Sequence, residues 1–121
     1  MSILAIDFGR KRIGLALSRS KQLVVPLPGI QLTSARALIT DLMAIINEEH
    51  VETVVVGHGI MQPALRQWLT VLQHQLTVPV VIAEETSTTN EAQQRVGTTH
   101  HHADSAAAAI ILERYVEDLL Q

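Results

Sequence analysis

The sequence contains no cysteine, which excludes disulfides, thiolate zinc sites and cysteine nucleophiles. It has one Phe, one Trp and one Tyr, too few rings for a surface on which successive bases stack. No apolar run approaches the roughly 20 residues of a membrane-spanning helix. The apolar start MSILAI is interrupted by Asp7 and is too short for a signal peptide. We therefore expect a cytoplasmic protein that does not contact membranes.

The length and the distribution of charge narrow the class of protein further. A chain of 121 residues, of which 47% are hydrophobic, fits one independently folding domain, residues 1–121. The formal net charge of -3 argues against a nucleic-acid partner, but residues 1–40 hold six basic residues and one acid. Residues 41–121 hold three basic residues and eleven acids. The N-terminal part is thus suited to phosphate groups, and an ordinary mixed-charge surface is the alternative.

Apolar periodicity predicts the order of the secondary-structure elements. Residues 3–7, 13–18 and 23–30 are short strand-like stretches in quick succession, as in an antiparallel meander. Pro26 and Pro28 each lack a donor for the sheet ladder, so the third strand is expected to lie at an edge of the sheet or to end early. Thr33 and Ser34 are capping residues, and the pattern after residue 34 predicts a helix. Further helices are predicted from 65 to 76, with Pro63 in the first turn, after a Thr88–Glu91 capping box, and from 103 to 120. Strands are predicted at 54–57 and 78–83.

This order predicts an α/β fold. A meander followed by βα units implies a mixed sheet, in which three antiparallel strands are joined by two parallel ones and helices cover both faces.

Three acidic positions follow or precede predicted elements. Asp7 ends the first strand and is followed by Gly9 and Gly14, which permit close approach of the backbone. Glu84 and Glu85 both follow the last strand, where open α/β sheets present ligands, and Asp104 begins the final helix. A hairpin turn and a helix cap are the structural alternatives. Clustered carboxylates raise one another's pKa unless a cation is present, so we expect them to bind Mg²⁺ or Mn²⁺.

The sequence resembles the YqgF/RuvX family of RNase H-like nucleases over essentially its whole length. The resemblance is carried by IDFGRKRIGLALS, VVVGHG, EETSTTNEA and ADSAAAAIIL. It implies an RNase H-like fold and a metal-dependent hydrolase of phosphodiester bonds. It also implies that Asp7, Glu85 and Asp104 are the catalytic residues and the metal ligands. Processing of the 5′ end of precursor 16S rRNA in ribosome biogenesis is the expected role, with structured RNA or branched DNA as substrate.

Roles for other residues follow from this resemblance and from their charge. A two-metal mechanism assigns Asp7 to both ions, with Glu85 and Asp104 on either side. Arg10, Lys11, Arg12 and Arg19 are expected to bind the nucleic-acid backbone without reading sequence, and Gly9, Gly14 and His102 to have auxiliary roles, His102 through protonation.

Three alternatives stay open. Thr86 stands where the family commonly has arginine, and His100–His102 replace a lysine-rich stretch. Both departures favour a nucleic-acid-binding module with weak or no cleavage. A Holliday junction resolvase requires a dimer with two active sites, whereas rRNA processing also suits a monomer. An actin-like ATPase also opens with an Asp-x-Gly turn, but it needs a second such domain.

Overall fold

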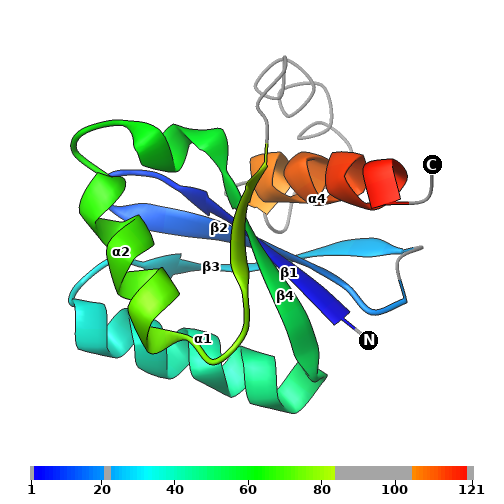
Figure 1. Ribbon diagram of the computed structural model, residues 1–121, viewed down its shortest axis with the longest axis horizontal. Coiled ribbons are helices and arrows are strands. Elements are labelled where there is room, and N and C mark those ends of the chain that lie inside the picture. Colours follow the sequence, from blue (N-terminus) through cyan, green and yellow to red (C-terminus); the bar gives the residue numbers. More distant parts are fainter. Residues whose placement is uncertain (1, 21–22, 84–104, 120–121) are drawn as a thin grey trace.

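The computed structural model describes residues 2–20, 23–83 and 105–119. Within these ranges, five strands form one sheet in the order β3-β2-β1-β4-β5 (Figure 1). The strands are β1 (Ser2–Phe8), β2 (Arg12–Ser18), β3 (Val24–Gln31), β4 (Val51–Gly57) and β5 (Val80–Ala83).

The sheet is mixed, as the sequence predicts. β1 pairs antiparallel with β2, and β2 pairs antiparallel with β3, which completes the meander. β4 lies parallel to both β1 and β5. The expected edge position of the proline-containing strand is confirmed, because β3 has β2 as its neighbour at one end of the strand order.

The helices are α1 (Ala35–Glu49), α2 (Arg66–Gln75) and α4 (Ala106–Leu119), with a short 3-10 helix, η1 (His58–Met61). Ser34 caps α1, since its side chain accepts a hydrogen bond from the Ala37 amide at 3.1 Å. The helix that Thr88 and Glu91 predict lies outside the described residues.

One detail of the predicted helices is wrong. Pro63 is not in the first turn of α2 but in the turn between η1 and α2, and η1 was not anticipated. The Gln62 carbonyl accepts hydrogen bonds from the amides of Leu65 and Arg66, at 2.9 and 3.0 Å. Pro63 follows this carbonyl directly, where its fixed φ suits the second position of a turn.

The two faces of the sheet are covered by different helices (Figure 1). One core lies between the sheet and α1 and α2, and includes Leu4, Ile6 and Phe8 of β1. A second core joins Ile3 and Ala5 of the same strand to α4. Alternate residues of β1 therefore serve opposite cores, as the period of a strand requires. Over the ranges that the structure describes, no helix has the length and hydropathy to cross a membrane.

Candidate functional site

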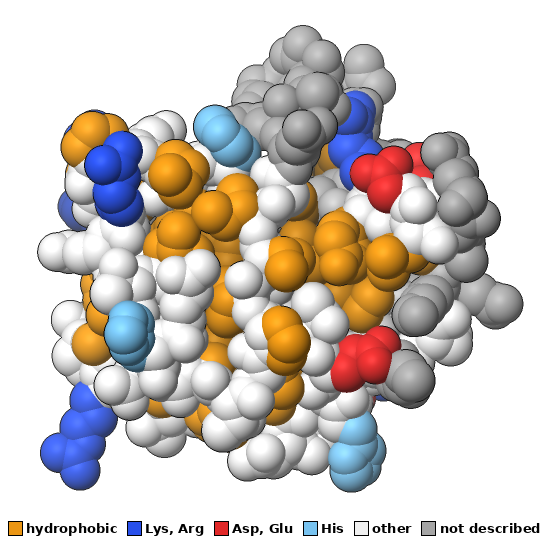
Figure 2. Space-filling view, viewed as in Figure 1, with side chains coloured by type: hydrophobic (Ala, Val, Ile, Leu, Met, Phe, Trp, Pro, Cys, Tyr) orange, Lys and Arg blue, Asp and Glu red, His pale blue; other side chains and the backbone are white. Residues whose placement is uncertain are grey.

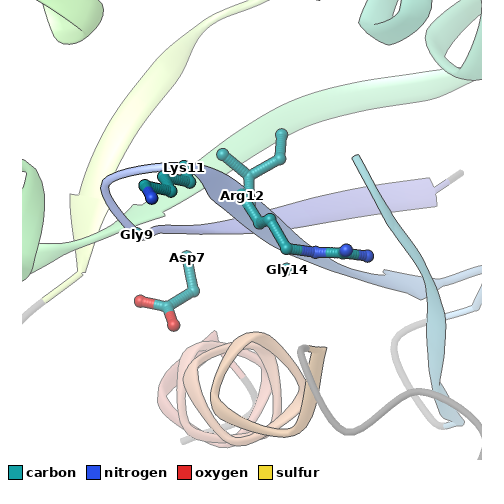
Figure 3. Close-up of a pocket in the computed structure, with 6 residues that line it drawn as sticks. Asp7, Gly9, Lys11, Arg12 and Gly14 are labelled. Carbon is teal, nitrogen blue, oxygen red and sulfur yellow. The ribbon is translucent and has the colours of Figure 1, made fainter. Parts of the chain in front are cut away.

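Asp7 lies near the carboxyl end of β1, on the face that α4 covers. It continues the alternation of Ile3 and Ala5, and Figure 3 shows its carboxylate directed toward the helix. Gly57 ends the parallel strand β4 beside it. A Cβ atom on Gly57 would lie 3.5 Å from Asp7 Oδ1 and only 2.7 Å from Ile111 Cδ1 of α4. The absence of a side chain at Gly57 thus makes room for Ile111, while the half-buried Asp7 would be in ordinary van der Waals contact with such a Cβ atom.

A pocket of about 310 Å³ opens beside this carboxylate (Figure 3). Its lining comes from β1, β2 and the turn between them: Asp7, Gly9, Lys11, Arg12, Ile13 and Gly14. The turn is closed by a hydrogen bond from the Gly9 amide to the Arg12 carbonyl at 2.9 Å. A Cβ on Gly9 would meet that carbonyl oxygen at 2.9 Å, so a larger residue would force the turn to shift.

The charges around the pocket combine one anion with two cations. Asp7 supplies the carboxylate, and Lys11 and Arg12 supply positive charge from the same hairpin. Arg10 is exposed in the same turn but does not line the pocket. On the described part of the face shown in Figure 2, Lys and Arg side chains stand apart at the periphery and apolar side chains occupy the middle. On the β1–β2 hairpin, by contrast, one carboxylate and two cationic side chains line the same pocket.

The first turn of α4 is attached to the sheet close to this pocket. Ser105 directly precedes α4 and is fully buried. Its Oγ accepts a hydrogen bond from the Leu15 amide at 2.9 Å and donates one to the Leu27 carbonyl at 2.6 Å. Leu15 follows Gly14, the residue opposite Asp7 in the β1–β2 register.

The structure brings some of the predicted site residues together and leaves others apart. Asp7, Gly9, Lys11, Arg12 and Gly14 share the pocket. The remaining acids, Glu85 and Asp104, and the auxiliary His102 lie outside the described residues.

Arg19 lies away from the pocket, just beyond the opposite end of β2. Its neighbour Ser18 is paired with Ile3 near the start of β1. The Arg19 guanidinium donates to both carboxylate oxygens of Glu49, with Nε to Oε1 at 2.9 Å and Nη2 to Oε2 at 3.2 Å. This hydrogen-bonded guanidinium lowers the pKa of the Glu49 carboxyl. The geometry gives Arg19 a role in joining β2 to the end of α1.

The donor set decides how far the pocket suits a metal ion. Mg²⁺ takes hard oxygen ligands and keeps several of its waters, so a carboxylate on an open hollow fits as one ligand. Asp7 meets that description. Across residues 2–20, 23–83 and 105–119, no group of three or more His, Cys, Asp or Glu side chains is placed to hold a metal. Further protein ligands would have to come from the rest of the chain.

Two residues of this region were not predicted from the sequence. Gly57 looked like the simple end of a strand, and Ser105 looked like part of an alanine-rich helix start. The signal for Gly57 was its position at the carboxyl end of a buried parallel strand beside the strand of Asp7. Ser105 bonds residues 90 and 78 positions away, a pairing that no local pattern reveals.

Comparisons with known proteins agree with this architecture. The family model described as RuvX, Holliday junction resolvase, matches residues 1–118. A protein of Maridesulfovibrio salexigens is 29% identical over 94 residues, covering 70% of this chain and 70% of its own. One of Chlamydia trachomatis is 33% identical over 97 residues, covering 69% of this chain and 64% of its own. Both carry the name pre-16S rRNA nuclease.

Solved structures resemble the whole chain. Thermus thermophilus RuvC in complex with a Holliday junction substrate has a TM-score of 0.62 at 14% identity, covering 99% of this chain and 96% of its own. The Fowlpox virus resolvase complex with Holliday junction DNA has a TM-score of 0.61 at 11% identity, covering 100% of both chains. These neighbours have the RuvC-like RNase H fold, so the predicted fold class is confirmed.

Proposed function

The chain belongs to the RuvX family, and from that premise we propose that it is a metal-dependent endonuclease that hydrolyses phosphodiester bonds in structured nucleic acid. The observation that carries the proposal is the position of Asp7. Its carboxylate lies at the edge of the sheet where the parallel strands end, close to Gly57. It lines a pocket together with Lys11 and Arg12. An anion for a metal ion and cations for a phosphate thus occur together.

We propose Glu85 and Asp104 as the partners of Asp7 in holding the metal. β1, β4 and β5 are parallel, so their carboxyl ends meet at one edge of the sheet. Glu85 comes two residues after Ala83, the end of β5, and Asp104 comes directly before Ser105. Because consecutive Cα atoms are about 3.8 Å apart, chain connectivity restricts both acids to the vicinity of those anchors. This connectivity supports one shared site.

The chemistry divides between the metal and the chain. Bound Mg²⁺ or Mn²⁺, as one ion or two, would lower the pKa of water and stabilise negative charge on the phosphate and the departing oxygen. Asp7 holds the ion, and the open pocket lets a phosphate reach it. Lys11 and Arg12 orient the phosphate backbone, and Gly9 keeps their turn tight. With few aromatic residues in the chain, recognition depends on backbone shape and on junctions between paired and unpaired strands.

The substrate we propose first is precursor 16S rRNA, acted on in the cytoplasm during ribosome biogenesis. The names of the two relatives support this choice. The second candidate is a Holliday junction, which the description of the family model favours. Cleavage of a junction in both strands needs two active sites, so only a dimer suits this second candidate, whereas rRNA processing also suits a monomer.

Asp7→Asn tests the proposal directly. This change keeps the size of the side chain but removes the charge that holds the cation, so cleavage of structured RNA or a four-way DNA junction with Mg²⁺ or Mn²⁺ should fall by at least about 100-fold. Asp41→Asn is the matched control, because Asp41 is exposed on α1, on the other side of the sheet. This variant should cleave at the wild-type rate. Equal rates for Asp7→Asn and wild type would reject the mechanism.

Binding and cleavage separate the remaining alternatives. If wild type binds both nucleic acids but does not turn over with either metal, the chain is a binding module. Turnover of precursor rRNA, but not of the junction, supports the first substrate, and symmetric cleavage of the junction by a dimer supports the second.

A further inference from the structure

We infer that Ser105 is a positioning residue, which sets the place of α4 against the strands that carry Gly14 and Asp7; this inference rests on the proposed function. Its basis is a pair of hydrogen bonds, one buried and one half-buried, that join the start of α4 to β2 and β3.

The β2–β3 ladder is irregular where Ser105 contacts it. Ile13 pairs with Ile30 and Leu15 pairs with Leu27, so β3 has one residue more than β2 between these pairs. Such a bulge leaves ladder groups without their regular partners. The Ser105 hydroxyl lies between the Leu15 amide and the Leu27 carbonyl and serves both. A side chain from α4 thereby replaces part of the strand pairing.

The attachment lies on the pocket side of the molecule. Gly14 is the residue of β2 inside the bulge, it lines the pocket, and it lies opposite Asp7. The hydroxyl therefore holds the start of α4 at Leu15, the residue that directly follows Gly14.

Loss of this hydroxyl would remove the hydrogen-bond partner of the buried Leu15 amide and of the half-buried Leu27 carbonyl. Such groups are costly to desolvate, so the bulge and the helix start would move to find new ones. Metal ligands must be held within about 0.5 Å of the productive geometry, and the bulge contains Gly14, the residue opposite Asp7. Metal affinity is thus expected to depend on Ser105.

A matched pair of serines tests this inference. Ser105 and Ser18 are both 0% exposed, but Ser18 Oγ has no hydrogen-bond partner among the described residues. Ser105→Ala should weaken Mn²⁺ binding, measured by calorimetry on the whole chain, by about 10- to 100-fold. It should also lower kcat and leave the KM for nucleic acid near the wild-type value. Ser18→Ala should match wild type in every respect.

Ser105→Cys keeps the experiment decisive if the alanine variant does not fold. The thiol is somewhat larger than the hydroxyl and is only a weak donor and acceptor, so the Mn²⁺ affinity of this variant should lie between those of Ser105→Ala and the wild type. A folded Ser105→Ala or Ser105→Cys protein that binds Mn²⁺ like the wild type overturns the inference. Failure of the proposed function gives a different result. In that case the wild type and Asp7→Asn bind Mn²⁺ equally, or neither binds it.

Discussion

The two faces of the central sheet differ in what their side chains do. On the face toward α1 and α2, large aliphatic and aromatic residues of the strands and helices form a continuous apolar core. On the face toward α4, the strands and the helix contribute many small residues: Ala5, Ala16, Gly57, Ala108 and Ala109. The second face also carries the Asp7 carboxylate and the Ser105 hydroxyl.

Small residues on the second face have a physical consequence. With little side-chain volume between them, α4 and the sheet approach closely, as the 2.7 Å from a Gly57 Cβ to Ile111 indicates. In that layer the Ser105 hydroxyl reaches backbone groups of both β2 and β3 within hydrogen-bonding distance. One face therefore stabilises the fold mainly by burying apolar area, and the other places chemical groups precisely.

The largest effect on stability should come from the face toward α1 and α2. Leu42 is fully buried in α1, so Leu42→Ala should lower the free energy of unfolding by about 2 to 5 kcal/mol. Activity per folded molecule should stay unchanged, because Leu42 lies across the sheet from Asp7. Urea denaturation together with cleavage assays checks both statements. If Leu42→Ala abolished cleavage while the protein stayed folded, the division between the faces would be wrong.

A smaller effect, on both properties at once, is expected at Gly57. Gly57→Ala places a methyl group against Ile111 and near Asp7, which should cost about 1 to 3 kcal/mol of stability and reduce cleavage. Ile111→Val removes the contacting Cδ1 atom, so the double variant should recover part of both losses. Non-additivity in this double-mutant cycle measures the contact. Strict additivity would show that Gly57 and Ile111 do not compete for the same space.

The sequence predicted the fold further than the site, for reasons that particular residues show. Alternating apolar residues and the cap at Ser34 act locally, so the strands, α1 and the edge position of β3 could be predicted. Pro63 was misplaced because proline suits a turn as well as a first helical turn. Ser105 could not be predicted, since its partners depend on how β2, β3 and α4 meet.

The same limit applies to the cationic residues. Charge alone grouped Arg19 with Arg10, Lys11 and Arg12, but in the fold Lys11 and Arg12 line the pocket and Arg19 binds Glu49. Sequence proximity does not distinguish the two ends of a strand.

Binding of nucleic acid offers a third test, at the two ends of β2. Replacing Arg10, Lys11 and Arg12 by alanine should weaken binding to all sequences alike. The slope of log affinity against log salt concentration should also become less steep, by up to about 0.9 for each phosphate group that the variant no longer neutralises. Arg19→Ala is the control and should leave that slope unchanged, because Arg19 pairs with Glu49. Equal changes in slope for both variants would place Arg19 in the nucleic-acid interface.

The smallest effect concerns the Arg19–Glu49 pair itself. Arg19 lowers the pKa of Glu49 in the folded protein, so the ionised carboxylate contributes stability at pH values above its unfolded pKa of about 4.3. This contribution is lost as the pH falls through the folded pKa. The difference in unfolding free energy between wild type and Glu49→Gln should therefore be positive near neutral pH and vanish in acid, with added salt reducing it. Glu48→Gln, an exposed neighbour, is the control. A wild-type advantage that persisted unchanged in acid would contradict the pairing.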